Sequence, residues 1–478
     1  MRTERIDPWR VRIPRHGGMR VDGIVYADAG LMADLRDDPC LEQVANVAHL
    51  PGIVGASIAM PDIHWGYGFP IGGVAAMDAE QGVVSPGGVG YDINCGVRLL
   101  RSTITAGELA PRLRDLVAQL FRNVPTGVGA GRRDLRLGRR DLERVLARGA
   151  AWAVGRGMGE ADDLLHIEEG GCLPQADPAE VSARASERGG PQLGTLGSGN
   201  HFCEVQVVDE IFDAEAADAF GLREGQVTVL LHSGSRGLGH QVCSDFLKVM
   251  LDASRRYEIA LPDRQLCSAP IRSEEGRRYL AAMAAAANFA FANRQVMTHW
   301  VRESFAAVFG LPAARLGLEV VYDICHNIAK FERFEVNGKQ RRLCVHRKGA
   351  TRAYPPGHPQ TPEAYREVGQ PVIIPGDMGR YSFVLAGTER AFAETFGSSC
   401  HGAGRRLSRH RAKAAARGRD LVAELAERGV VVMADGMATV AEEMPEAYKD
   451  GADVVGVVEG AGISRRVARL RPLGVIKG

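Results

Sequence analysis

The fold is organised around a glycine-rich stretch that carries a carboxylate and a thiol. It is Gly87-Gly88-Val89-Gly90-Tyr91-Asp92-Ile93-Asn94-Cys95-Gly96-Val97-Arg98. Glycine lets the backbone bend tightly and approach a bound group closely. A hard oxygen ligand three residues before a soft sulfur ligand suits a borderline divalent metal better than calcium or magnesium. The stretch is therefore a candidate metal cradle, with Asp92 and Cys95 as ligands, and its nitrogen ligands must come from elsewhere.

Four histidines in turn-like or glycine-rich surroundings are the candidate nitrogen ligands. His201 follows Gly-Ser-Gly-Asn before a predicted strand, and His232 lies where an apolar strand reaches a Ser/Gly turn. His326 lies inside a strand-like run, and His401 lies in a turn before a basic segment. Neutral imidazole is a common ligand of zinc, manganese, iron and nickel. Convergence of residues so far apart in sequence is a hypothesis that only a structure can test.

Three glycine loops, at 197–200, 233–237 and 402–405, are candidate phosphate-binding sites. Backbone N–H groups in such loops bind phosphate. None of the three matches a Walker A motif or a dinucleotide fingerprint. The side chains expected to meet phosphate or RNA are Arg236, Lys348, Arg405 and Arg409.

The composition is that of a soluble globular protein, with 45% hydrophobic and 24% charged residues among 478. The net charge of +1 means that a polyanionic partner needs local basic patches. Nine cysteines without a CxxC motif favour a reduced, cytoplasmic protein. Residues 1–19 lack the apolar core of a secretory signal, and the run 279–291 is too short to span a membrane. No membrane role is expected.

Helices and strands do not alternate regularly, which argues against a doubly wound sheet. Helices are expected at 41–50, 108–124, 140–154, most of 241–309 and 405–428, and strands at 52–60, 74–77, 202–208, 227–231, 372–374, 381–385 and 430–433. Asn337-Gly338 predicts a hairpin between 318–334 and 340–346. Residues 61–70 are expected to form a shaped loop, after a basic N-terminal arm. We expect an α+β fold: one large domain over 1–478 with mixed and antiparallel sheets flanked by helices, and a helical excursion near 240–310.

Two basic segments are candidate RNA-binding surfaces. Arg132, Arg133, Arg136, Arg139 and Arg140 form a run that fits either a solvated helix face or an RNA-facing patch. In the expected helix 405–428, Arg405, Arg409 and Lys413 recur every four residues and would form one basic stripe.

Several long motifs, in order along the chain, resemble the RtcB-type RNA-splicing ligases. They are residues 61–68 (PDIHWGYG), 90–96 (GYDINCG), 193–202 (LGTLGSGNHF), 232–240 (HSGSRGLGH), 347–352 (RKGATR) and 399–405 (SCHGAGR). The resemblance extends to the terminal Lys-Gly, so it implies an RtcB-like fold over the whole chain.

The resemblance implies a GTP- and Mn²⁺-dependent enzyme that acts in tRNA splicing and RNA repair. It would join RNA ending in a 2′,3′-cyclic phosphate or 3′-phosphate to RNA with a 5′-hydroxyl, through a GMP-histidine and an RNA-3′-pp-G intermediate. By motif position, Asp92, Cys95 and His201 would hold one Mn²⁺, and Cys95, His232 and His326 the second. Other divalent metals could replace Mn²⁺ in a purified sample. His401 would be the nucleophile, oriented by Asp62.

The resemblance also implies a GTP/GMP site in which the Glu204 carboxylate selects guanine. The matching residues are Asn200, His201, Phe202, Cys203, Glu204, His326, Asn327, Pro375, Gly376, Asp377, Met378, Ser382, His401, Gly402, Ala403, Gly404, Tyr448 and Lys477. Cys203, Asp377 and Arg380-Tyr381 depart from the family pattern. Asp377 would bring a carboxylate close to phosphates.

Two other functions use the same residues. A dinuclear-metal phosphoesterase or nucleotide hydrolase would use the cluster with water as its only nucleophile. A non-catalytic RNA-binding protein with structural zinc would unfold when the metal is removed. A covalent GMP adduct on His401 separates the ligase from both. The resemblance adds RNA and GTP as partners, together with an archease-type activator, and we expect a monomer.

Overall fold

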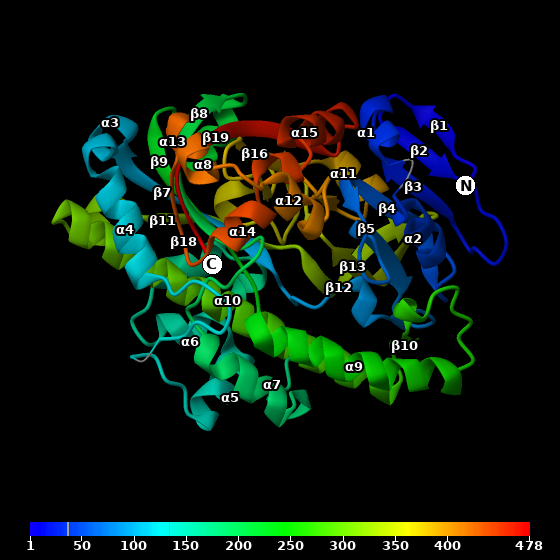
Figure 1. Cartoon of the computed structure of the whole chain (residues 1–478). Helices are drawn as coiled ribbons and strands as arrows, with labels where there is room; N and C mark the ends of the chain where they lie inside the picture. Colours follow the sequence, from blue (N-terminus) through cyan, green and yellow to red (C-terminus); the bar gives the residue numbers. More distant parts are fainter. Residues whose placement is uncertain (36–37, 133) are drawn as a thin grey trace.

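The computed structural model describes residues 1–35, 38–132 and 134–478, so Arg133 of the basic run lies outside the described residues. Two large sheets and a layer of helices make up the architecture (Figure 1). The helical layer includes α9 (Arg236–Arg256) and α10 (Glu274–Phe309), with the break between them where the sequence predicts one. It runs along the lower part of the view in Figure 1.

The first sheet has seven strands in the order β1-β2-β3-β4-β5-β13-β12. Their bounds are β1 (Glu4–Asp7), β2 (Arg10–Ile13), β3 (Asp22–Tyr26), β4 (Ile53–His64), β5 (Ile71–Asp78), β12 (Asn327–Val336) and β13 (Lys339–Lys348). Asn337 and Gly338 both have positive φ, 53° and 73°, and join β12 to β13 in the predicted hairpin.

The second sheet has eight strands in the order β11-β7-β9-β8-β19-β16-β15, and β18 pairs with β19 beside this path. Their bounds are β7 (Gly96–Thr105), β8 (Phe202–Ile211), β9 (Gln226–Ser233), β11 (Glu319–Cys325), β15 (Pro371–Ile374), β16 (Ser382–Gly387), β18 (Val431–Ala434) and β19 (Ser464–Lys477). Only the β3–β4 and β18–β19 pairs are parallel among the described strand pairs. The α+β prediction with mixed and antiparallel sheets is confirmed.

The predicted long helix over 405–428 is wrong. Two short helices, α12 (Arg409–Ala415) and α13 (Leu421–Glu427), stand there instead. Gly418 has φ of +79°, and the Asp420 side chain caps α13, so the chain turns between the two helices. Arg405 precedes α12, and the expected stripe with Arg409 and Lys413 on one helix does not form.

Three further segments differ from the expectation. The N-terminal arm contains β1 to β3, and Pro61–His64 continue β4 rather than beginning the loop. The C-terminal tail is β19, which lies between β8 and β16 in the second sheet. Arginines and Pro472 conceal this strand in the sequence, because proline cannot donate to the strand ladder. A shift of register at Pro472/Gly474 accommodates it.

A buried ion network joins α10 to the loop that carries Asp92 and Cys95. Arg294 donates from Nη2 to Asp323 Oδ1 and from Nε to Oδ2, each at 2.8 Å, and Arg98 Nε donates to the same Oδ2 at 2.8 Å. Arg294 Nη1 also donates to the carbonyls of Asn94 at 2.8 Å and Ser233 at 3.0 Å. The network therefore fixes the metal-cradle loop and the end of β9 to one helix.

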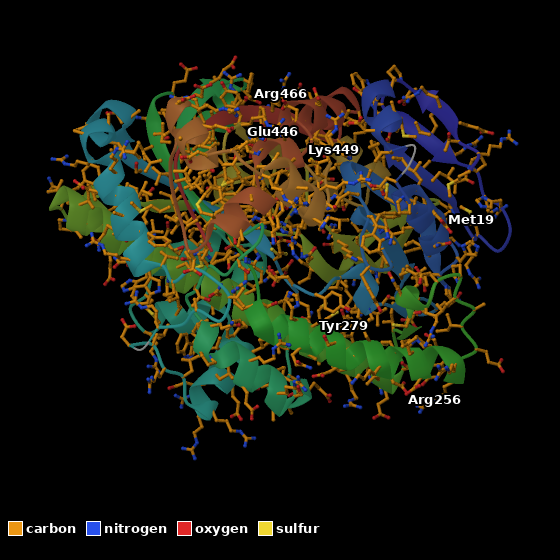
Figure 2. All side chains as sticks on the ribbon, in the orientation of Figure 1. Met19, Arg256, Tyr279, Glu446, Lys449 and Arg466 are labelled. Atoms are coloured by element: carbon orange, nitrogen blue, oxygen red, sulfur yellow. The ribbon has the colours of Figure 1, made fainter. Side chains whose placement is uncertain are left out.

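Apolar side chains fill the space between the sheets and the helices. Tyr279 of α10, labelled in Figure 2, is fully buried, as is nearly the whole middle of that helix. Despite its length, α10 is not apolar enough to cross a membrane, and neither is another helix of the described chain.

Candidate metal and nucleotide site

The order of strands in the second sheet brings four predicted metal ligands together at one end of four neighbouring strands. Cys95 directly precedes β7, His232 is the penultimate residue of β9, His201 directly precedes β8, and His326 directly follows β11. The antiparallel register places Gly96 opposite both Ser233 and Cys325, and Phe202 opposite His232. Neighbouring strands thus present these side chains side by side, although the four residues are spread over more than 200 positions of the chain.

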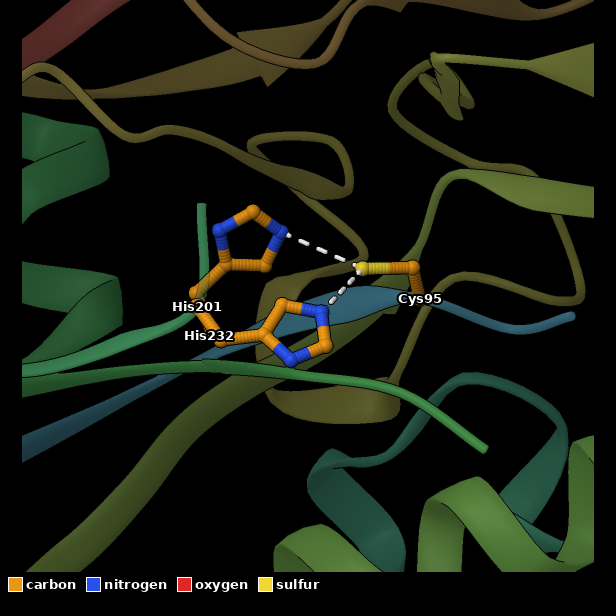
Figure 3. Close-up of side chains that lie close together, drawn as sticks. All are labelled: Cys95, His201 and His232. Carbon is orange, nitrogen blue, oxygen red and sulfur yellow. Dashed lines mark hydrogen bonds between the residues drawn. The ribbon is translucent and has the colours of Figure 1, made fainter. Parts of the chain in front are cut away.

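The ligand atoms of these residues converge, and Figure 3 shows three of the side chains, Cys95, His201 and His232, close together. The Cys95 sulfur lies 3.3 Å from His201 Nε2 and 3.3 Å from His232 Nε2. His232 Nε2 lies 3.3 Å from His326 Nε2, and His201 Nε2 lies 2.9 Å from Asp92 Oδ2. All five predicted ligands are therefore in one connected cluster.

The protonation states of the cluster fit a cation. Burial lowers the pKa of His232 and His326 well below the ordinary value, so both rings are neutral and keep a lone pair. Burial raises the pKa of Cys95 well above its ordinary range, so the thiol needs a cation to become a thiolate. Burial would raise the pKa of Asp92 too, but the hydrogen bond with His201 lowers it on balance.

Second contacts orient the imidazole of His201. Its Nδ1 lies 3.0 Å from the Leu196 carbonyl, which would accept a hydrogen bond from Nδ1–H when the Nε2 lone pair binds a metal in place of the hydrogen bond to Asp92. The guanidinium of Arg236 lies 2.9 Å from the same Nδ1. Thiolate, imidazole and carboxylate ligands together suit a divalent transition metal better than calcium or magnesium.

His401 lies next to the cluster and is held by a carboxylate. Its Nδ1 is 2.6 Å from Asp62 Oδ2, and its ring centroid is 4.7 Å from that of His326. The backbone N–H groups of His401 and Gly402 also donate to Asp62 Oδ2, at 3.1 and 3.3 Å. Lys449, labelled in Figure 2, donates to the carbonyls of Pro61 and Ile63 on either side of Asp62. Asp62 thus orients the imidazole through Nδ1, and the residues that the structure describes offer no hydrogen-bond partner to its Nε2.

A cavity of about 630 Å³ is lined by His401 and by the five candidate metal ligands, which we call the metal cluster. It is lined by every residue expected to contact GMP except Cys203 and Ser382. Cys203 alternates with Phe202 and Glu204 along β8, so its side chain lies in the core. Ser382 lies behind the cavity wall, where its hydroxyl accepts from the Gly376 N–H at 3.0 Å.

Glu204 is a buried carboxylate with one close polar partner. Gln206 Nε2 donates to Glu204 Oε1 at 2.6 Å and to the Ser382 hydroxyl at 3.0 Å. Burial raises the pKa of Glu204 to about 8, and the Gln206 bond and Lys477 act against that rise. At pH 7 the Glu204 carboxyl group is therefore mostly neutral in the unliganded protein.

The Asp377 departure is compensated within its own turn. Asp377 Oδ1 accepts from the backbone N–H groups of Gly379 and Arg380, each at 3.0 Å, and Oδ2 accepts from Arg380 Nε at 2.5 Å. Asp377 and Arg380 form an ion pair, so the Asp377 carboxylate is not an unpaired charge in the cavity wall.

The four expected phosphate contacts have different surroundings. All four line the cavity, and the Arg409 side chain is 60% exposed. Arg405 donates to Glu443 at 3.0 Å and to the Glu442 carbonyl at 2.7 Å. Lys348 is buried and donates to the carbonyls of Tyr67 and Phe69. Burial lowers the pKa of Lys348 to about 7. Arg409 is thus the most accessible cation of the four.

Several cavity residues were not predicted from the sequence. They are His64, Tyr67, Tyr91, Arg188, Gln192, His240 and Glu443. The aromatic-rich loop 61–70 and the position of Tyr91 beside Asp92 were available signals. Glu443 gave none, because it follows an ordinary short helix, α14 (Met437–Glu442), and its partner Arg405 comes from a distant segment.

Comparisons with known proteins agree with the motifs. The family model described as "tRNA-splicing ligase RtcB" matches residues 43–478. The chain is 58% identical over 476 residues to the tRNA-splicing ligase RtcB of Thermococcus kodakarensis, covering 99% of this chain and 98% of that protein. It is 56% identical to the Archaeoglobus fulgidus protein of the same name, covering 98% and 97%, and 50% identical to that of Nanoarchaeum equitans, covering both in full.

Proposed function

Because the chain belongs to the RtcB family of tRNA-splicing ligases, we propose that it joins a 2′,3′-cyclic phosphate or 3′-phosphate RNA end to a 5′-hydroxyl RNA end at the expense of GTP. The protein is an RNA ligase. The observation that carries the finer proposal is the His401–Asp62 pair beside the metal cluster. A hydrolase would use the same pair as a general base toward water, so a covalent GMP adduct on His401 is what separates the two functions.

In the first step, His401 Nε2 attacks the α-phosphorus of GTP. A nitrogen–phosphorus bond forms, the bond to the bridging oxygen breaks, and pyrophosphate leaves. The Nδ1 proton, directed at Asp62, fixes the tautomer with the lone pair on Nε2, so no general base is required. The negative carboxylate also stabilises the positive charge that the ring acquires.

Asp92, Cys95 and His201 would hold one Mn²⁺, and Cys95, His232 and His326 would hold the second, with Cys95 shared. When bound, two divalent cations supply neutralisation of the charge on the transferring phosphoryl group.

Where the RNA ends in a cyclic phosphate, water opens it to the 3′-phosphate before guanylylation. An oxygen of the 3′-phosphate then attacks the phosphorus of the His401-linked GMP, which breaks the nitrogen–phosphorus bond and gives RNA-3′-pp-G. The 5′-hydroxyl finally attacks the RNA 3′-phosphorus, GMP leaves, and the strand is sealed. Each step replaces one bond at phosphorus by another and needs no further reactant.

Ionised Glu204 would accept hydrogen bonds from guanine N1–H and N2–H. Adenine has no donor pair on that edge and would leave a buried charge unpaired, which gives large discrimination. The remaining nucleotide contacts would come from the cavity residues between Asn200 and Lys477.

RNA phosphates would meet Arg236, Arg409, Lys348 and Arg405, all four of which line the cavity. The wider proposal includes a monomeric state and an activating partner of the archease type. It also places the enzyme in the cytoplasm, because its nine cysteines are free thiols, which persist in a reducing compartment.

Incubation with α-labelled GTP and Mn²⁺ tests the proposal. We expect acid-labile label on the protein, and no label on His401→Ala. Addition of a cyclic-phosphate RNA and a 5′-hydroxyl RNA should release the label and yield a longer RNA. Hydrolysis of GTP or of the cyclic phosphate without labelled protein would instead support a phosphoesterase.

A further inference from the structure

Three aromatic rings line the cavity beside the metal cluster, and the proposed reaction assigns them no role. Tyr67 and Tyr91 meet edge to face, with ring centroids 5.5 Å apart and planes at 71°. Tyr91 and His240 are stacked, with centroids 5.7 Å apart and planes at 29°. Tyr67 comes from the loop after β4, Tyr91 from the metal-cradle loop and His240 from α9. We call these three residues the aromatic platform.

The three residues of the platform come from segments of the chain that are not expected to contact GMP. The GMP residues lie in 200–204, 326–327, 375–382, 401–404, 448 and 477, and none of the three rings falls in these ranges. Tyr91 is instead the chain neighbour of Asp92. A group stacked on the platform would therefore lie next to the metal cluster without occupying the guanine contacts.

Hydrogen bonds hold the platform in place before a ligand arrives. Lys348 donates to the carbonyls of Tyr67 and Phe69, and Gln43 bonds to both the N–H and the carbonyl of Gly66. Gly90, with φ of +98°, makes the turn that presents Tyr91. These hydrogen bonds fix the backbone of the loop that carries Tyr67, so the loop loses little conformational entropy when a ligand binds.

Cationic side chains share the cavity with the platform. Arg188, Arg236 and Arg409 all line it. Arg188 Nη1 donates to Gln241 Oε1 at 2.8 Å, which holds Arg188 close to His240 on α9. Arg236 Nη1 lies 2.9 Å from His201 Nδ1, which holds Arg236 close to the candidate metal ligands. Stacking surfaces next to positive charge are the combination by which proteins bind single-stranded nucleic acid.

We propose that one nucleobase of the RNA end that is being joined binds against the rings of Tyr67, Tyr91 and His240, while the neighbouring arginines hold its phosphates. This inference rests on the proposed ligase function. Contact with an aromatic ring is available to every base, so the platform accepts bases without regard to sequence. It also sets the distance between the terminal phosphate and Asp92, because Tyr91 and Asp92 are adjacent.

Binding of RNA with and without the terminal base tests the platform. The probes are a 3′-phosphate RNA and a 5′-hydroxyl RNA, each labelled with fluorescein at the far end, and the same two RNAs with an abasic terminal nucleotide. Fluorescence anisotropy is measured with the full chain and Mn²⁺, without GTP. We expect loss of the base to weaken binding about 5- to 150-fold at one of the two ends, which also identifies the end that stacks.

Variants link this loss to the rings. Tyr91→Ala and Tyr67→Ala should weaken binding of the intact RNA by a similar factor and bind the abasic RNA as the unaltered protein does. That second result also reports that the variants are folded. Tyr91→Phe and Tyr67→Phe keep the rings and should retain affinity. Trp65→Ala is the matched control, because Trp65 is 57% exposed in the same loop but does not line the cavity.

Equal affinity for intact and abasic RNA at both ends would overturn the platform. So would a loss in the alanine variants that is the same with abasic RNA. Because these measurements contain no GTP, they are independent of the GMP adduct. A chain that distinguishes abasic RNA but is never labelled by GTP would keep the platform and refute the ligase mechanism.

Discussion

His401 Nδ1 lies 2.6 Å from Asp62 Oδ2, although the two residues are 339 positions apart in the chain. The same carboxylate oxygen accepts from the backbone N–H groups of His401 and Gly402. Asp62 therefore holds both the ring and the turn that carries it. This relationship is what distinguishes His401 from the histidines of the metal cluster.

Asp62→Asn should slow formation of the GMP adduct about 10²- to 10⁴-fold, because the amide can bond to the ring but cannot stabilise its positive charge. Single-turnover labelling with α-labelled GTP measures the rate, with His401→Ala as the zero. Asp209→Asn is the control, because Asp209 pairs with Arg469 outside the cavity. Labelling of Asp62→Asn at the unaltered rate would show that the carboxylate has no part in the reaction.

The preference for GTP over ATP should rise with pH between 6 and 8 and then level off. Glu204 must be ionised to accept from guanine, and burial raises its pKa to about 8, so the guanine complex weakens about tenfold per pH unit below that value. Asp377 opposes ionisation of Glu204, whereas Lys477 and the Gln206 bond favour it. Calorimetric titration gives the ratio of the two affinities, in which titration of the shared triphosphate cancels.

Two variants isolate the carboxylate in that experiment. Glu204→Gln should remove the pH dependence of the ratio together with the preference. Gln206→Met removes a donor that lowers the Glu204 pKa, so its profile should move to higher pH. A ratio that is constant over this range in the unaltered protein would contradict the role of Glu204.

Cys95→Ala should lose bound metal and the stabilisation that metal provides. In the unaltered protein, Mn²⁺ at about 100 times its Kd should stabilise the folded state by about 2.7 kcal/mol and raise the thermal midpoint. The variant should show little or no rise, because the shared ligand is missing. Cys243→Ala is the control, since Cys243 is an equally buried free thiol outside the cluster. An equal rise in Cys95→Ala would exclude the sulfur as a ligand.

Asp323→Asn should destabilise the fold by about 3–5 kcal/mol, because it leaves the buried Arg98 and Arg294 without a charged partner. Urea unfolding measured with apo protein separates this effect from metal binding. Asp252→Asn removes an exposed carboxylate paired with Arg255 and should change stability by less than about 0.5 kcal/mol. Equal stability of the two variants would mean that the network is not needed.

Arg409→Ala should weaken RNA binding and reduce its dependence on salt. Each phosphate contact with single-stranded RNA contributes about 0.7 to the slope of log affinity against log salt, so the slope should fall by about that amount. Arg406→Ala is the matched control, because Arg406 is equally exposed but pairs with Asp34 outside the cavity. An unchanged slope in Arg409→Ala would remove Arg409 from the RNA contacts.

The parts of the fold that could be predicted were those with a strong local signal in the sequence. The two positive-φ residues Asn337 and Gly338 predicted their hairpin, and the apolar spacing of 241–309 predicted α9 and α10 with the break between them. Where local signals conflict with tertiary structure, the prediction failed. Basic residues suggested one helix over 405–428, but Gly418 and the Asp420 cap divide it. β19 was missed because it contains several arginines and Pro472, which are uncommon in a central strand. Its place in the sheet follows from its pairing with β8 and β16.

The sequence alone determined the chemistry that the site can carry: a thiol, a carboxylate, imidazoles, and glycine loops that bind phosphate, together with the family to which the chain belongs. Only the tertiary structure decided which of these groups meet. The antiparallel order β11-β7-β9-β8 aligns the ends of four strands and brings Cys95, His201, His232 and His326 together. It also paired Arg405 with Glu443 and left Arg409 exposed. Pairing between distant segments depends on the packing of the whole chain, and no local pattern of residues records it.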